Sequence, residues 1–154
     1  MSATKTPMTT PAEAEQACAA ATGVIERLRE VIERETALVQ RGELRSAAAL
    51  GVAKAALAGE LFACGETVKA NAAFLAQAAP AACAALKRVE AAFRAVLQRN
   101  MVAIATAHAV SEGIVRRLSG DLAKKASPQV YGSSGRAVAP NPKRALPLAV
   151  SRTL

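Results

Sequence analysis

The side chains that could perform acid–base or nucleophilic chemistry are few and stand far apart. The single histidine of the 154-residue chain, His108, lies between alanines in a helix-forming stretch, which favours a packed or groove-lining residue over a general base. The three cysteines, Cys18, Cys64 and Cys83, form no CxxC pair and have no base at a supporting spacing. We therefore expect buried thiols, no metal site, no cofactor and no enzymatic activity.

Two further patterns resemble an acid–base pair and a phosphate-binding loop, but the residues next to them exclude both. Glu26, Glu30 and Glu33 alternate with arginines, which is typical of a solvated helix face rather than of an acid–base pair. The Gly-Ser-Ser-Gly segment at 132–135 is followed by no lysine and begins no helix, so it is not a phosphate-binding loop. Binding through helical surfaces, without a small-molecule substrate, is then the default function.

The composition predicts an all-α fold. The chain has 39 alanines but only three phenylalanines, one tyrosine and no tryptophan, so the aromatic residues that strands favour are nearly absent. Alanine, leucine, arginine and glutamate lose little entropy in a helix. Because alanine buries little apolar area, we expect an elongated, coiled-coil-like antiparallel bundle of three long helices that gains stability from a partner.

The chain divides into three parts in this interpretation: a disordered leader over 1–10, a helical bundle domain over 11–127 and a flexible basic, proline-rich tail over 128–154. Thr10, Pro11 and Glu13 have the types and spacing of a helix N-terminus with a capping box.

The first helix is expected to run to about Gln40, with Gly42 adopting the left-handed conformation that ends it. A second helix is expected over about 44–77. Pro80 either begins a third helix, which then extends to about 124, or kinks a continuous helix.

The third helix is apolar over an unusually wide arc. Placed at roughly 100° per residue, its apolar side chains form two adjoining stripes that cover about half of the circumference. The first stripe includes Leu86, Phe93, Leu97, Asn100, Ile104, Ser111, Val115, Leu118 and Leu122, and the second Val89, Val96, Ala103, Val110 and Ile114. Two explanations remain open: two helices cover this arc in a complete core, or one side stays free for a partner.

The charge is unevenly distributed. Residues 1–77 carry a net charge of −1 and residues 78–154 carry +9. An acidic protein partner accounts for this asymmetry as well as nucleic acid does. The scattered positions of the basic residues, the lack of aromatic platforms and the lack of helix-turn-helix spacing argue against nucleic acid.

The sequence also predicts a cytoplasmic protein. Residues 1–11 lack the apolar stretch of a signal peptide. The longest uncharged run, between Lys69 and Lys87, includes Asn71, Gln77 and Pro80 and is too polar for a membrane span.

Four features, spread over residues 24–136, resemble the FlgN family of bacterial flagellar export chaperones. They are an acid-rich helix end followed by a glycine turn, a lysine in the second helix, an Arg-Asn pair before a long apolar repeat in the third helix, and a Tyr-Gly-x-x-Gly element in the tail. The residues concerned are Glu35-Thr36-Ala37-Leu38, Arg41-Gly42-Glu43-Leu44, Lys54, Arg99-Asn100, Tyr131-Gly132 and Gly135.

The resemblance implies a cytosolic chaperone of type III flagellar export. Such a protein binds the C-terminal helical region of hook-associated flagellar proteins, prevents their premature assembly and delivers them to the cytosolic domain of the export gate; the export ATPase complex is a further candidate partner. The implied gate-binding residues are Tyr131, Gly132 and Gly135. The implied client-binding residues are Asn100, Ile104, Val110, Ile114, Val115, Leu118 and Leu122.

Alternatives to this assignment stay open. An alanine-rich amphipathic chain also resembles the phasins, structural proteins that coat granules, and a basic accessory protein of nucleic acid is a third hypothesis. Tyr131 is either a linear docking element, because a tyrosine ring offers a large contact area at low entropic cost, or an incidental loop residue.

Overall fold

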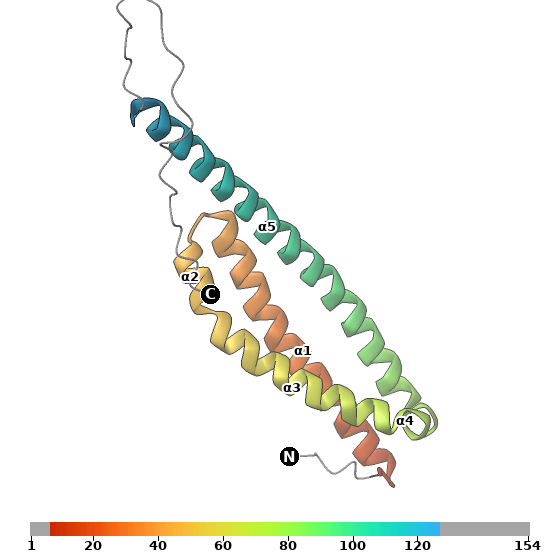
Figure 1. The fold of residues 1–154 in the computed structure, drawn as a ribbon. Helices are drawn as coiled ribbons and strands as arrows, with labels where there is room; N and C mark the ends of the chain where they lie inside the picture. Colours follow the sequence, from red (N-terminus) through yellow and green to blue (C-terminus); the bar gives the residue numbers. More distant parts are fainter. Residues whose placement is uncertain (1–6, 127–154) are drawn as a thin grey trace, which may run out of the picture. The chain divides into compact units, whose positions relative to one another are not determined.

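The computed structural model describes residues 7–126, which form α-helices joined by short turns and contain no strand. The all-α prediction is therefore confirmed. Residues 1–6 of the expected leader and the expected tail over 128–154 lie outside the described range. The helices are α1 (Pro11–Gln40), α2 (Leu44–Ala49), α3 (Gly51–Ala70), α4 (Ala72–Ala78) and α5 (Pro80–Ala126) (Figure 1).

The chain divides into two units that meet after Val110. The first unit contains α1 to α4 and α5 up to Val110. In the second unit the described residues, 111–126, are the remaining helical part of α5.

Both ends of α1 form as the sequence predicts. The Thr10 hydroxyl accepts a hydrogen bond from the Glu13 backbone N–H (3.3 Å), and the Glu13 carboxylate accepts from the backbone N–H groups of Thr9 (2.8 Å) and Thr10 (3.0 Å). These bonds hold the pKa of Glu13 below its ordinary value, because they favour the ionised carboxylate. At the other end Gly42 has a φ of 76°, and the Glu43 N–H returns to the Leu38 carbonyl (2.9 Å) in a Schellman motif.

The expected second helix over 44–77 is wrong as a single element, because it is interrupted at Leu50 and Asn71. The Leu50 N–H donates to the Ala47 carbonyl, three residues back instead of the four of a regular α-helix, and the flexible Gly51 follows. The Asn71 side chain accepts from the Met8 N–H (2.9 Å) and donates to the Thr67 carbonyl (3.0 Å). A side-chain amide that bonds nearby backbone offers an alternative to the helical ladder, which explains the second interruption.

Pro80 begins α5 and does not kink a continuous helix. Ala79, the residue before it, has backbone angles outside the helical range, with φ −140° and ψ 58°. A residue before proline is pushed out of the helical conformation, because the proline ring clashes with its backbone.

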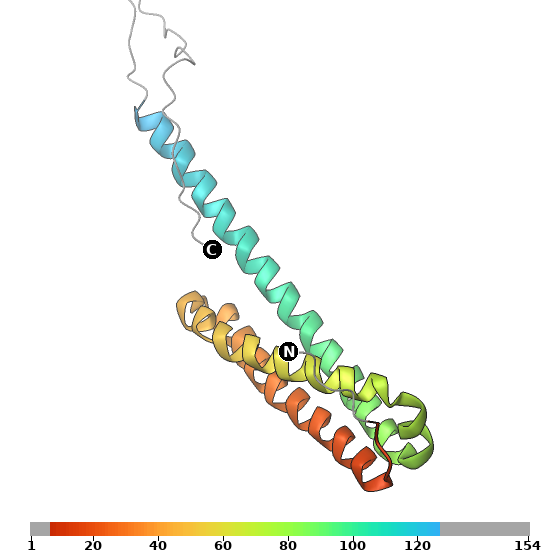
Figure 2. The same cartoon turned by 60° about the horizontal axis from the view of Figure 1, so that its bottom comes forward.

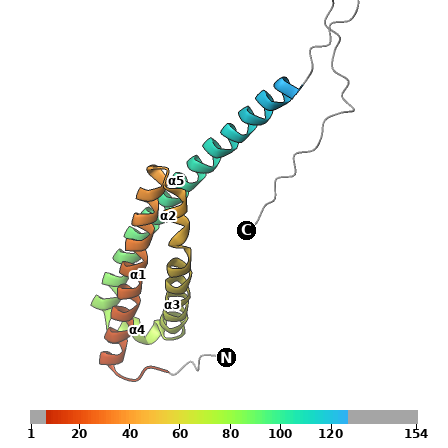
Figure 3. The same cartoon turned by 90° about the vertical axis from the view of Figure 1, so that its left-hand side faces the viewer.

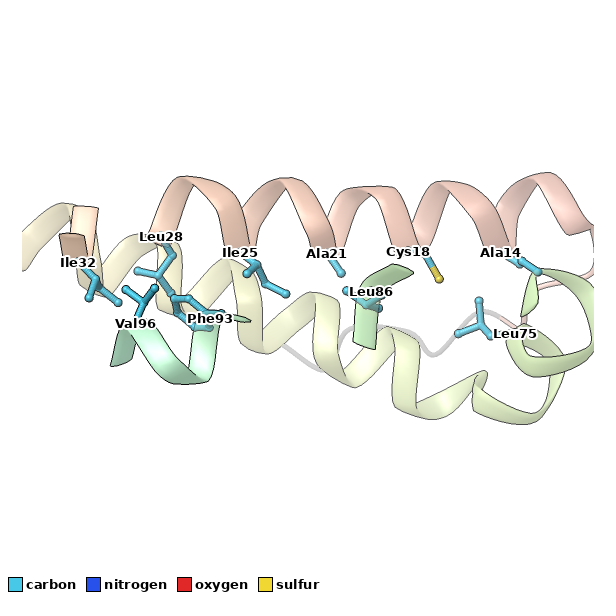
Figure 4. Close-up of a cluster of buried hydrophobic side chains, with 11 residues drawn as sticks. Ala14, Cys18, Ala21, Ile25, Leu28, Ile32, Leu75, Leu86, Phe93 and Val96 are labelled. Atoms are coloured by element: carbon cyan, nitrogen blue, oxygen red, sulfur yellow. The ribbon is translucent and has the colours of Figure 1, made fainter. Parts of the chain in front are cut away.

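The core of the first unit lies along one face of α1 (Figure 4). Small side chains occupy its first half and larger ones its second half. They pack against Leu75 of α4 and against α5, while α3 adds partly buried residues from its inner side. The buried residues of this core are Ala14, Cys18, Ala21, Ile25, Leu28 and Ile32 on α1 and Leu86, Phe93 and Val96 on α5. The partly buried α3 residues are Leu57, Leu61, Cys64 and Val68.

Four contacts define the relative directions of the helices in the first unit. Arg27 pairs with Glu60 and Glu35 with Lys54, so α3 runs opposite to α1. Cys18 contacts Cys83, and Glu35 accepts a hydrogen bond from Asn100. The two residues of each pair are 65 positions apart in the sequence, so this part of α5 runs parallel to α1. Figure 2 shows α4 making the turn into α5, and Figure 3 shows α2 beside the end of α1. There Leu38, Val39 and Ala47 form a second small cluster with Leu50, Ala103 and Ala107.

One stretch of the described chain, Leu44–Ala70, has the length and apolar composition of a membrane span. It covers α2 and α3, and few of its residues are buried. Length and composition alone are weak evidence for a membrane segment.

Two glycine substitutions should have opposite effects on stability. Gly42→Ala should lower the free energy of unfolding by about 1 kcal/mol, because an L-residue is strained at positive φ. Gly59→Ala should raise it by up to about 1 kcal/mol, because an added Cβ on this helical residue meets open space. Urea unfolding followed by circular dichroism measures both, and shifts of the same sign would contradict the assignment of the two positions.

Candidate protein-binding surface

The described part of the second unit presents an exposed apolar helix face. Ile114, Val115, Leu118 and Leu122 are each between 54% and 58% exposed. Their spacing of three and four residues places them on one side of the helix. We call these four residues the distal apolar face.

Several large apolar residues of α5 in the ten positions before Ser111 are also exposed. Ile104 is 40% exposed and Val110 57%. Met101 and Val102, which the sequence analysis did not assign to the client surface, are 64% and 57% exposed. Their apolar types were visible in the sequence, but only the packed structure shows that no neighbour covers them.

The end of α1 accounts for the exposure of Val110 within the first unit, but not for that of Met101, Val102 and Ile104, which lie before it. The offset of 65 residues between paired positions of α1 and α5 places Gln40, the last residue of α1, level with Ala105. Phe93 and Val96 lie before that level and are buried, whereas Val110 lies beyond it.

The distal apolar face has the size and chemistry to bind another helix. Burying one exposed isoleucine or leucine side chain contributes about 1.5–3 kcal/mol, so four such residues offset part of the entropic cost of association. The charged residues of 111–126 are Glu112, Arg116, Arg117, Asp121, Lys124 and Lys125, which give this segment a net charge of +2.

Asn100 is placed differently from the other implied client-binding residues, because it is only 6% exposed. Its Nδ2 atom donates to Glu35 Oε2 (2.9 Å) and to Thr36 Oγ1 (3.0 Å). Lys54 Nζ donates to the other Glu35 oxygen at 2.6 Å. Asn100 therefore belongs to an interior polar cluster that joins α1, α3 and α5, and it does not line the exposed surface.

This polar cluster of Glu35, Thr36, Lys54 and Asn100 is fully satisfied. Thr36 donates its hydroxyl proton to the Ile32 carbonyl (2.8 Å), which leaves its oxygen to accept from Asn100. Among the described residues, every buried side-chain nitrogen and oxygen has a partner. A charge removed from water is tolerated only with such pairing, so the cluster favours one register of the three helices.

Of the remaining residues singled out in the sequence, the structure brings Cys18 and Cys83 together. The described range contains no group of three side chains that could hold a metal ion. Burial and the neighbouring Cys83 thiol raise the pKa of Cys18 above that of an ordinary thiol. His108 is exposed on α5. The implied gate-binding residues Tyr131, Gly132 and Gly135 lie outside the described residues.

No protein-family model, curated protein or solved structure matches this chain.

The polar cluster should contribute more to stability than an exposed ion pair. Lys54→Met should lower the free energy of unfolding by about 1–3 kcal/mol, because it leaves the nearly buried Glu35 carboxylate without its cation. Arg27→Met is the matched control: its pair with Glu60 is about half exposed, so the loss should be within about 0.5 kcal/mol. Urea unfolding of both variants checks the difference, and equal losses would contradict it.

Proposed function

We propose that this protein is a FlgN-like chaperone of flagellar type III export that acts in the cytoplasm. On an antiparallel bundle of three long helical segments, it holds the C-terminal helical region of a hook-associated protein before export. The observation that carries the proposal is the exposure of Ile114, Val115, Leu118 and Leu122 on the helix that also contains the buried residues Leu86, Phe93 and Val96.

The resemblance gains support from where its residues lie. Glu35, Lys54 and Asn100 come from three separate sequence features and meet in one polar cluster. Gly42 occupies the left-handed position that ends α1. Glu35, Lys54, Asn100 and Gly42 thus have structural roles in setting the length and register of the helices.

The proposed mechanism is helix recognition by an apolar surface. An amphipathic client helix places its own apolar stripe on the distal apolar face, which removes both surfaces from water. While it is bound, the same client stripe cannot pair with other subunits, so premature assembly is prevented. Tyr131, with Gly132 and Gly135, then docks the loaded chaperone on the cytosolic domain of the export gate, with the export ATPase complex as a further partner.

The double variant Ile114→Asp with Leu118→Asp should abolish client binding. Two lost apolar contacts and two carboxylates facing an apolar client should weaken affinity by at least about 100-fold. Calorimetry with a synthetic C-terminal helix peptide of a hook-associated protein from the same genome measures this, and circular dichroism verifies that the variant is still helical.

The matched control is Val52→Asp with Phe62→Asp, which places the same charges on exposed apolar residues of α3. This control should bind the peptide as the unmodified chain does. Unchanged affinity in a folded Ile114/Leu118 variant, or equal losses in both variants, would refute the assigned surface.

Tyr131→Ala should separate the two binding activities. We expect it to leave client affinity unchanged and to weaken binding to the purified cytosolic domain of the export gate by about tenfold or more, as loss of a tyrosine anchor does. Equal gate affinity of the variant and the unmodified chain would refute the role of Tyr131.

A phasin-like coat protein is a second candidate, and the outer side of α3 favours it. Val52 and Phe62 are 84% and 72% exposed, and no residue of this 20-residue helix is buried. A coat protein would adsorb to apolar particles through this side. Retention on polystyrene beads that is lost in the Val52/Phe62 variant, together with no peptide binding, would select the coat function over the chaperone.

A further inference from the structure

Two cysteines from distant parts of the sequence meet inside the first unit. The Sγ atoms of Cys18 on α1 and Cys83 on α5 lie 4.0 Å apart. Cys18 is buried and Cys83 is partly buried. Alanines surround the contact: Ala14 and Ala21 lie on α1, Ala79 directly precedes α5, and Ala82 lies on α5.

We propose that Cys18 and Cys83 form a thiol-oxidation site, at which a disulfide bond links α1 to the beginning of α5. The two sulfur atoms already face each other across the helix interface and must come about 2 Å closer to reach bonding distance. Rotation about the Cα–Cβ bonds and a small shift of two alanine-lined helices provide that movement. In the reduced protein the same contact is a weak thiol–thiol hydrogen bond.

The oxidant in this reaction is a low-molecular-weight disulfide such as oxidised glutathione. The more accessible Cys83, as its thiolate, attacks one sulfur of the oxidant, forms a mixed disulfide and releases one small thiolate. Cys18 then loses its proton to solvent and attacks the Cys83 sulfur, which forms the protein disulfide and releases the second small thiolate. The protein loses two protons and two electrons, and the oxidant is reduced to two thiols.

The chain carries its own control for this pair. Cys64 on α3 borders the same core and is also partly buried, but among the described residues it has no sulfur contact. Oxidation that depends on proximity should therefore spare Cys64 and join Cys18 to Cys83. A disulfide between these positions closes a long loop, so it should restrict the unfolded chain and raise the thermal midpoint by at least about 5 °C.

The test uses the full chain with Cys64→Ser, reduced and then incubated with oxidised glutathione. We expect a monomer that migrates faster on a non-reducing denaturing gel, a linked peptide pair containing Cys18 and Cys83 by mass spectrometry, and the higher thermal midpoint. Cys18→Ala and Cys83→Ala in the same background should each abolish the fast species. Circular dichroism of each variant verifies that it is folded.

Three outcomes would overturn the proposal. Both thiols could stay reactive towards an alkylating agent after the oxidant treatment. Glutathione could remain on Cys83 as a mixed disulfide without displacement by Cys18. In the chain that retains all three cysteines, Cys64 could be the residue that forms the intramolecular bridge.

Discussion

The first unit covers its part of α5 along only some of its length, and this limit underlies the proposed function. The Schellman motif at Gly42 ends α1, because a left-handed residue there turns the chain away from the helix axis. Within the first unit α5 keeps several large apolar residues exposed: Met101, Val102, Ile104 and Val110. An apolar surface of this kind is favourable to bury, so it is suited to a guest helix.

The interior polar cluster has a complementary role. In an alanine-rich interface, side-chain packing differs little from one helix register to the next, because the side chains are nearly identical in size. Glu35, Lys54 and Asn100 satisfy one another only when α1, α3 and α5 stand at one particular offset. A slip of one turn would leave a buried carboxylate without its partners, and that cost favours the native register over alternatives that bury similar apolar area.

The same small residues that weaken the core bring the helices close together. Near the start of α1 the core contains the small residues Ala14, Ala21 and Ala79, and the Cys18 and Cys83 sulfurs lie 4.0 Å apart there. Farther along, larger side chains such as Ile25, Leu28 and Phe93 provide most of the buried area. The core thus combines a closely approaching end, where covalent chemistry between helices is feasible, with an end stabilised by apolar burial and the polar cluster.

Local features of this protein were determined by the sequence alone. The capping box at Thr10 and the left-handed turn at Gly42 depend on the conformational limits of single residues, and those limits act wherever the residue occurs. At Pro80 the sequence left a helix start and a kink open, and the structure shows the helix start. The all-helical class followed in the same way from alanine content. The interruption at Asn71 did not, because it depends on a hydrogen bond to Met8, 63 residues away.

The tertiary structure alone decided which apolar residues are covered. Phe93 and Ile114 have the same hydrophobic character and the same helical spacing, yet one is 7% exposed and the other 54%. Likewise Asn100 resembled a surface residue until the offset between α1 and α5 placed it beside Glu35. Burial depends on where the neighbouring helix ends and in which register it packs, and these are properties of the assembled chain that no single segment encodes.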